Sequence, residues 1–270
     1  MPFLSHEPSG LLYHTSSLLE DPGLVHAFTT RRGGVSRDHL SSLNLRSSVD
    51  PLARENYLRL CAALQVSPQR LVLSKQVHQD AVLHVTAEDA GSGFLRPAGY
   101  TADALVTDVP GLNLMVFSAD CIILLLWDPV SRSIGAVHAG WRGAALDLPA
   151  KAVREMGRLF GAKPEDIRVA IGAGIGPCCF ETHGDVPGAM RAAFGPGAEA
   201  YIAPRGEKWT VDLKELNAWR LREAGVPPEH TDICPLCTAC RTDLYWSHRK
   251  TGDKRGVQGA LIGLRREASR

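Results

Sequence analysis

Two apolar runs separated by a short polar segment dominate the middle of the chain. One run extends from Ile122 to Trp127, the other ends at His138, and the turn-prone residues 128–132 lie between them. This pattern predicts an antiparallel hairpin. If the turn centres near Val130, Cys121 lies within one residue of facing His138. Directly opposed residues have Cβ atoms about 5 Å apart, so the hairpin is expected to bring a thiol and an imidazole together.

Helices and further strands are expected on both sides of this hairpin. Helical spacing of apolar residues, with capping residues at the start and glycine or proline stops, predicts helices over residues 52–65, 148–160 and 213–224. Shorter apolar runs predict strands over residues 71–85, 101–107 and 167–171, and a final strand ending at Leu264. His78 falls near the middle of the first of these strands. Without internal repeats or a convincing linker, residues 1–270 are expected to form one domain.

Composition narrows the range of partners. The chain has 270 residues, 44% of them hydrophobic, with 30 Lys and Arg against 29 Asp and Glu. Such a balance creates no field that would recruit nucleic acid or an anionic membrane, so a small-molecule partner is expected. The sequence lacks a membrane-spanning apolar stretch, and its first residues lack an export signal, so a cytoplasmic location is expected. Seven unevenly spaced cysteines favour reduced thiols over a disulfide framework.

A thiolate beside an imidazole is a ligand pair suited to zinc or copper and poorly suited to magnesium or calcium. A third ligand is available in His78, which lies in the segment Gln76–Asp80 among possible ring-orienting acceptors. His78, Cys121 and His138 would leave a tetrahedral ion with one open position, as in catalytic zinc sites. The alternative is a buried, inert thiol with two core histidines, and long gaps between ligands favour this alternative when spacing alone is considered.

Two other segments have residues that could bind an anion. Arg31 and Arg32 lead into the pair Gly33-Gly34, and such a basic turn can hold an anion or simply be solvated. Arg142 follows the hairpin in a glycine-containing bend, where it could face a bound anion or pack the turn. The glycines at 172–176 do not indicate a dinucleotide site, because a proline closely follows them and a suitably placed acidic residue is lacking.

The cysteines near the C-terminus are more ambiguous. Cys234, Cys237 and Cys240 form two overlapping CxxC spacings, which suggest a zinc or iron–sulfur site. Because no second cluster of ligands follows nearby, the sequence favours the absence of structural zinc. Asp103, the only charge in its apolar segment, is interpreted as a turn or capping residue.

Seven motifs occur in an order that resembles a known family. They are TRxGGVS at 30–36, SLNL at 42–45, QVH at 76–78, SADC at 118–121, AVHAGWRG at 136–143, GIGPCCFE at 174–181 and CT at 237–238. Together they resemble the multicopper polyphenol oxidase (laccase) domain family, also called the purine nucleoside phosphorylase YfiH/LACC1 family. The likeness spans nearly the whole chain.

The resemblance implies a single α/β (α+β) domain in which helices flank mixed β-sheets. It also implies a catalytic metal held by His78, Cys121 and His138, with zinc as the metal and copper as the alternative. Activities associated with the family are phosphorolysis of adenosine, inosine, guanosine and methylthioadenosine, adenosine deamination and, in older assignments, phenol oxidation. The chain departs from the family pattern at Ile123, where proline is common, and at residues 247–251, where SHRKT replaces SYRRD.

These implications lead to a hypothesis about roles. Arg31 is expected to hold phosphate, with Arg142 or Arg249 as substitutes, because a guanidinium group can grip phosphate bidentately. Asp120 is expected to shuttle a proton, orient a ligand or cap the loop before Cys121. The partners would be purine nucleosides and phosphate, and the protein a monomer or homodimer.

Three rival classes stay open at this point. One is a copper-dependent polyphenol oxidase, although a laccase calls for many more clustered histidines than three. Another is a cysteine hydrolase acting on cell-wall precursors, with Cys121 as nucleophile and His138 as base. The third is a binding protein without catalytic activity.

Overall fold

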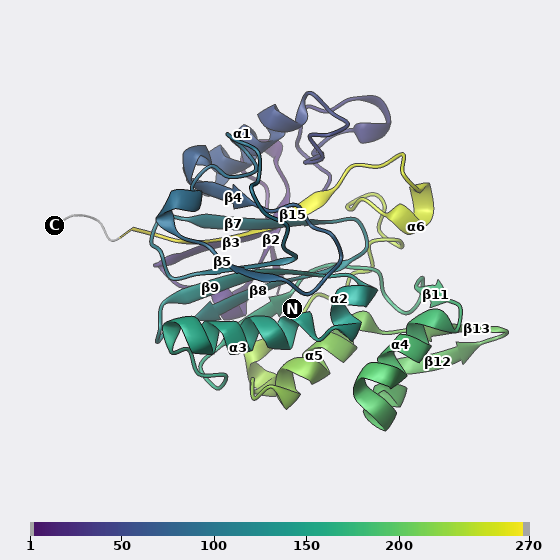
Figure 1. Ribbon diagram of the computed structural model, residues 1–270. Coiled ribbons are helices and arrows are strands. Elements are labelled where there is room, and N and C mark those ends of the chain that lie inside the picture. Colours follow the sequence, from purple (N-terminus) through teal and green to yellow (C-terminus); the bar gives the residue numbers. More distant parts are fainter. Residues whose placement is uncertain (1–2, 267–270) are drawn as a thin grey trace.

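Two six-stranded mixed sheets, packed face to face, form the centre of the structure (Figure 1). The structure is a computed structural model and describes residues 3–266. In spatial order, the first sheet contains β1 (Phe3–His6), β2 (Tyr13–Ser16), β3 (Leu24–Thr29), β15 (Gln258–Leu264), β7 (Asn113–Ser118) and β4 (Leu71–Leu73). The second contains β14 (Thr231–Ile233), β10 (Arg168–Ile171), β8 (Ile122–Asp128), β9 (Ser133–Ala139), β6 (Ala104–Thr107) and β5 (Val82–His84). A smaller sheet contains β11 (Glu181–Thr182), β13 (Lys208–Val211) and β12 (Ile202–Arg205).

Helices cover the outer faces of the two large sheets (Figure 1). The helix α1 (Ala53–Leu64) packs on the first sheet, and α3 (Leu148–Phe160) and α5 (Leu213–Glu223) pack on the second. The remaining helices are α2 (Trp141–Ala145), α4 (Asp185–Phe194) and α6 (His248–Thr251). The expected α/β class, with mixed sheets flanked by helices, is confirmed.

The continuous apolar run of β8 follows from burial on both of its faces. Ile122, Leu124 and Leu126 contribute to the core beneath α3 and α5. Ile123 and Leu125 point the other way, into the core between the two large sheets. Successive side chains of a strand alternate between faces, so a strand buried on both sides needs apolar residues at every position.

The three long helices occur where the sequence predicts them, within one residue at each end. Asp212 caps α5 by accepting hydrogen bonds from the backbone amides of Lys214 and Glu215. Gly161 ends α3 in the left-handed conformation, with φ of +71°. Local capping chemistry therefore sets these boundaries.

The predicted single strand over residues 71–85 is wrong. It divides into β4, which pairs with β7 in the first sheet, and β5, which pairs with β6 in the second. His78 lies in the segment between them, with φ of +60°. Since the chain crosses from one sheet to the other here, His78 lies on a loop.

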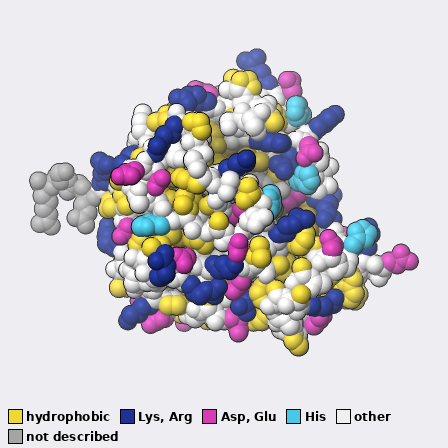
Figure 2. Space-filling model, viewed as in Figure 1, with side chains coloured by type: hydrophobic (Ala, Val, Ile, Leu, Met, Phe, Trp, Pro, Cys, Tyr) yellow, Lys and Arg dark blue, Asp and Glu magenta, His cyan; other side chains and the backbone are white. Residues whose placement is uncertain are grey.

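The charged side chains on the surface reflect the nearly equal numbers of basic and acidic residues in the chain. Figure 2 shows Lys and Arg side chains interspersed with Asp and Glu over the viewed face. Within residues 3–266, none of the helices combines the length and the apolar character needed to cross a membrane.

Candidate metal centre and active site

The central hairpin forms as predicted, with its register one residue from the expected one. Ile123 of β8 lies opposite His138 of β9. Cys121 immediately precedes β8, two positions before Ile123, and is therefore a diagonal neighbour of His138. Diagonal neighbours on one face of a sheet are about 7–8 Å apart at their Cα atoms, still within reach of longer side chains.

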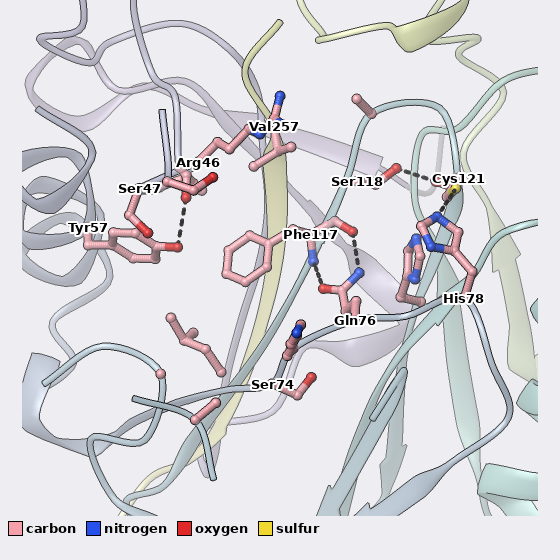
Figure 3. Close-up of a pocket in the computed structure, with 18 of the residues that line it drawn as sticks. Arg46, Ser47, Tyr57, Ser74, Gln76, His78, Phe117, Ser118, Cys121 and Val257 are labelled. Atoms are coloured by element: carbon pink, nitrogen blue, oxygen red, sulfur yellow. Dashed lines mark hydrogen bonds between the residues drawn. The ribbon is translucent and has the colours of Figure 1, made fainter. Parts of the chain in front are cut away.

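His78 joins this pair from the loop between β4 and β5. Its Nε2 atom lies 3.8 Å from Sγ of Cys121, and its ring centroid lies 4.9 Å from that of His138, at an interplanar angle of 82°. One ligand atom from each of His78, Cys121 and His138 falls within 4.8 Å of the others. Figure 3 shows His78 beside Cys121 at one end of a cavity. The structure thus brings together all three residues for which the sequence predicts metal binding.

Asp103 positions two of these three residues. Its Oδ1 atom accepts hydrogen bonds from His138 Nδ1 (2.8 Å) and from the amide of His78 (3.0 Å). Its Oδ2 atom accepts from the amides of Val77 (3.0 Å) and Gln79 (2.9 Å). The side chain is fully buried. Because Nδ1 of His138 faces this carboxylate, Nε2 is the nitrogen that can bind a metal, as is usual for histidine ligands.

The side chains of Cys121 and His138 shift each other's protonation. Burial opposes ionisation of Cys121, but His138 and His78 outweigh it and lower the pKa of the thiol to about 6. Burial likewise opposes the charged form of His138, while Asp103 and Cys121 raise the pKa of the imidazole to about 9. Both shifts favour the thiolate form of Cys121 and the charged form of His138. A thiolate is the form of cysteine that binds metals and acts as a nucleophile.

Backbone conformation around the group is unusual. His78 and Asp120, which precedes Cys121, have φ of +60° and +88°, a region that non-glycine residues seldom occupy. A Cβ atom at Gly140 would lie 3.0 Å from Sγ of Cys121 and 3.1 Å from Cδ2 of His78. Glycine therefore keeps the space beside these donors clear. One thiolate and two imidazoles around such a space fit a zinc or copper ion.

Two cavities adjoin the three residues, and both are lined by His78, Cys121 and Arg255. The first, of about 510 Å³, is also lined by Arg46, Tyr57, Gln76 and Phe117. Figure 3 shows it with Tyr57 at the end opposite His78. The second, of about 410 Å³, is also lined by Asp120, Trp141, Phe180 and Arg249. Each cavity combines aromatic side chains with guanidinium groups.

The three arginines predicted to bind phosphate, Arg31, Arg142 and Arg249, lie in different places. Arg31 lies outside the lining of both cavities: its guanidinium donates to the carbonyl oxygens of Ser41 and Thr242 and stacks on Trp246 at 3.8 Å. These hydrogen bonds hold chain segments together outside both cavities, and the expected phosphate-binding role of Arg31 stays a prediction. The exposed Arg142 stacks on Trp141 at 4.2 Å. Of the three, Arg249 is the one that lines a cavity.

Asp120 connects the start of the β8–β9 hairpin to the C-terminal segment. Its carboxylate accepts hydrogen bonds from Thr238 Oγ1 (2.6 Å), Ser247 Oγ (3.0 Å) and the amide of Arg249 (2.7 Å). It also lines the second cavity. Its main visible role is to anchor the segment that carries Arg249 beside Cys121.

Sequence reasoning missed three residues of the site. The sequence around Asp103 predicts a turn or capping residue, although a lone charge in an apolar segment is a signal of a functional role. Arg255 belongs to the basic segment near the C-terminus, and only the fold reveals that it reaches both cavities. Arg46 contributes a second guanidinium to the first cavity, and its positive charge, after burial, helps to lower the pKa of Arg255. Two guanidinium groups lining one cavity favour binding of an anion there.

The fold and these side chains define an α/β protein with a candidate metal centre flanked by two cavities. A family model described as multi-copper polyphenol oxidoreductase laccase matches residues 25–265. The chain belongs to this family, as the motifs in its sequence predict.

Relatives in the family carry enzyme names. The chain is 34% identical to the purine nucleoside phosphorylase YlmD of Geobacillus stearothermophilus over 251 residues, covering 91% of this chain and 92% of the relative. It is 38% identical to a purine nucleoside phosphorylase of Deinococcus radiodurans over 255 residues, covering 92% and 93%. The crystal structure of YlmD from Geobacillus stearothermophilus superposes with a TM-score of 0.92, at 31% identity, covering 98% of this chain and 99% of that one. The names of these relatives support the interpretation that this chain is an enzyme.

Proposed function

We propose that this chain is a zinc-dependent purine nucleoside phosphorylase acting on adenosine, inosine, guanosine and methylthioadenosine. The observation that carries the proposal is the group formed by His78, Cys121 and His138 where two cavities meet. The names of the relatives support the reaction class. We also propose a cytoplasmic location, because all seven cysteines are free thiols and free thiols persist in reducing compartments.

His78, Cys121 and His138 would hold the zinc ion. Three protein ligands are typical of catalytic zinc, whereas structural zinc has four. When bound, zinc supplies a Lewis acid that stabilises negative charge on oxygen atoms of the substrates. Asp103 keeps His138 in the orientation and tautomer that this binding requires.

The two cavities suit the geometry of phosphorolysis. Phosphate must approach C1′ of the ribose from the side opposite the purine, as the bond to the base breaks and positive charge develops on the sugar. We place the base in the second cavity, against Trp141 and Phe180, and phosphate in the first, beside Arg46 and Arg255. The ribose then lies between them. This assignment replaces Arg31 as the phosphate ligand and keeps Arg249 for the nucleoside side.

Adenosine deamination is part of the proposal as a second activity. It requires attack of water on C6 of adenine instead of attack of phosphate on C1′. The two reactions therefore need different orientations of adenosine in the same site. Product analysis distinguishes them, because phosphorolysis releases adenine and deamination releases inosine.

Copper-dependent phenol oxidation is the activity suggested by the family description. A laccase combines a type 1 copper with a trinuclear centre and needs many histidine ligands. Among residues 3–266, the one candidate metal-binding group that contains histidine is formed by His78, Cys121 and His138. We therefore favour a single zinc ion over several copper ions.

A cysteine hydrolase is the second candidate, and a specific geometry favours it. Cys121, His138 and Asp103 provide a thiolate, an imidazole and a carboxylate that orients the imidazole, the arrangement of an activated cysteine nucleophile. The two candidates respond differently to reagents. A hydrolase survives removal of metal by a chelator, whereas the proposed phosphorylase loses activity and regains it with zinc.

The direct experiment replaces His138 with alanine. We expect the His138→Ala variant to lose phosphate-dependent release of hypoxanthine from inosine together with one bound zinc. The exposed His39 provides a matched control, His39→Ala, which should keep both. Unchanged turnover in His138→Ala would refute the proposed function.

A further inference from the structure

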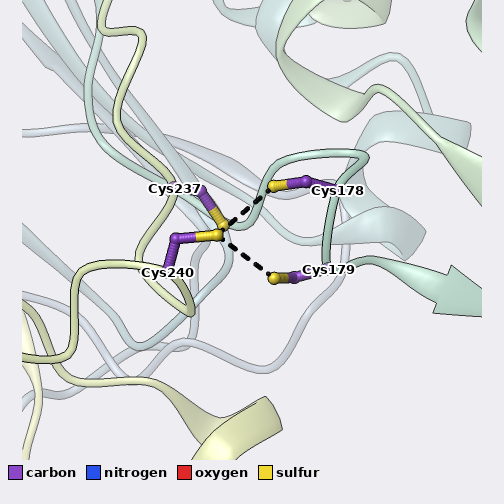
Figure 4. A group of neighbouring side chains, drawn as sticks. All are labelled: Cys178, Cys179, Cys237 and Cys240. Carbon is purple, nitrogen blue, oxygen red and sulfur yellow. Dashed lines mark hydrogen bonds between the residues drawn. The ribbon is translucent and has the colours of Figure 1, made fainter.

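Four cysteines outside the candidate active site converge on one point. Cys178 and Cys179 lie between β10 and β11, and Cys237 and Cys240 follow β14. Figure 4 shows the four side chains pointing toward one another from these two segments. Their Sγ atoms all lie within 4.8 Å of one another. Cys240 Sγ is 3.6 Å from Cys178 Sγ and 3.4 Å from Cys179 Sγ.

These spacings match the ligands of a single metal ion. Zinc binds four thiolates tetrahedrally with Zn–S distances of about 2.3 Å, which separates the sulfur atoms by about 3.8 Å. A disulfide requires an S–S distance of about 2.05 Å, and all seven cysteines are free. In polynuclear iron–sulfur clusters the thiolates bind different iron atoms, which places some of them farther apart than ligands of one ion.

The backbone holds the two segments together. Gly174 forms a bridge with Cys237, and the amide of Thr238 donates to the carbonyl of Gly174 (3.1 Å). The amide of Gly176 donates to Sγ of Cys237 (3.2 Å), so this sulfur already accepts a hydrogen bond suited to a thiolate. These backbone contacts at Gly174 and Gly176 thus hold the two cysteine pairs side by side.

We propose that Cys178, Cys179, Cys237 and Cys240 bind one divalent zinc-class cation as a structural, tetrathiolate site. Four protein ligands leave no position for a substrate, which separates this site from the three-ligand group. Cys234, which completes the overlapping CxxC spacing in the sequence, is not part of it. The two further ligands that the sequence lacked nearby are Cys178 and Cys179.

The expected role of this site is to fix one wall of the second cavity. Nη1 of Arg249 donates to the carbonyl oxygens of Cys179 (3.2 Å) and Glu181 (2.7 Å). Thr238, the neighbour of Cys237, donates to Asp120 (2.6 Å). A cation joining the two cysteine pairs would therefore hold Arg249 and Phe180 in place beside Cys121.

The test is a count of bound zinc by elemental analysis of the native full-length protein and its variants. We expect about two zinc ions per chain in the wild type and about one in Cys240→Ser, because loss of one thiolate opens the tetrahedral site. His138→Ala should also retain about one ion, held by the four cysteines. Cys234→Ala is the matched control and should keep both ions.

Cobalt substitution reports the type of ligand at the site. Co²⁺ replacing zinc in the wild type should give the intense near-ultraviolet thiolate-to-cobalt absorption of a tetrathiolate site, and His138→Ala should keep it. If Cys240→Ser does not fold, Cys178→Ser provides the second variant, at another exposed ligand on the other segment. Either variant should lose most of this absorption and keep the weaker part that the single thiolate of Cys121 contributes.

Two results would overturn the inference. One is a wild type with a single metal ion that disappears in His138→Ala. The other is a disulfide among the four cysteines, detected by mass spectrometry under non-reducing conditions. Neither result depends on catalytic activity, so the inference can fail while the proposed function stands, and the reverse also holds.

Discussion

Replacement of Asp103 by asparagine tests the organisation of the candidate metal centre. The substitution keeps the shape of the side chain and removes its charge and one acceptor. The native carboxylate accepts four hydrogen bonds, two on each oxygen. An asparagine amide has one oxygen and one NH₂ group, so one pair of these donors loses its acceptor in either orientation.

The cost can be estimated for each orientation. With its oxygen toward His138, the amide leaves the backbone N–H groups of Val77 and Gln79 unpaired, at about 1–3 kcal/mol each if buried. Both residues are exposed, so water can compensate, and we expect a loss of about 2 kcal/mol in the free energy of unfolding. In the other orientation, NH₂ faces Nδ1 of His138 and forces its proton onto Nε2. That nitrogen would then be unable to bind a metal.

Both orientations weaken zinc binding. Loss of a partner that orients a histidine ligand typically costs about 10–100-fold in metal affinity, equivalent to about 1.4–2.7 kcal/mol. The assay titrates zinc into metal-free protein and follows phosphorolysis of inosine in a zinc-buffered solution, while urea unfolding reports stability. Asp108→Asn, an exposed position just beyond β6, is the matched control. Unchanged zinc affinity in Asp103→Asn would refute the positioning role of this carboxylate.

Three further outcomes are expected. Arg255→Ala should raise the KM for phosphate by about 10-fold or more, because a charged hydrogen bond contributes about 1.5–3 kcal/mol, and an equal KM in variant and wild type would count against the assignment. Gly140→Ala should lower metal occupancy, since its Cβ would contact Cys121 Sγ at 3.0 Å, whereas Gly143→Ala meets nothing closer than 3.5 Å and serves as control. Zinc affinity at the three-ligand site should rise with pH. Between about pH 6 and 9, zinc displaces one proton, that of His138, from the Cys121–His138 pair, and below pH 6 it displaces two. Calorimetry in buffers of different ionisation enthalpy measures these protons, and a proton release independent of pH would contradict the pair.

Several features followed from local sequence patterns alone. Helices α1, α3 and α5 were predictable because apolar spacing, the cap at Asp212 and the stop at Gly161 act within a few residues. The β8–β9 hairpin was predictable because its turn-prone segment is short and both strands are apolar. The motifs also indicated the family, and residue chemistry singled out His78, Cys121 and His138 as candidate metal ligands.

Only the tertiary structure decided which distant groups meet. The strand predicted around His78 became a loop because the buried carboxylate of Asp103 binds the amides of residues 77–79. That carboxylate lies 24 or more positions away in the sequence. Asp103 thus contributes distant contacts that build the site, whereas Arg31 makes its distant contacts outside both cavities. Its guanidinium N–H groups donate to the carbonyl oxygens of Ser41 and Thr242, contacts that the sequence does not reveal.

The cysteines illustrate the same limit. Cys237 and Cys240 have a compact spacing, but their partners Cys178 and Cys179 precede them by about 60 residues and reach them only through the packing of two loops. Local propensity and periodicity act over a few residues, whereas metal centres and cavities depend on contacts between elements placed by the whole fold. The sequence by itself therefore determined the elements and the candidate ligands, and the tertiary structure decided which side chains share a site.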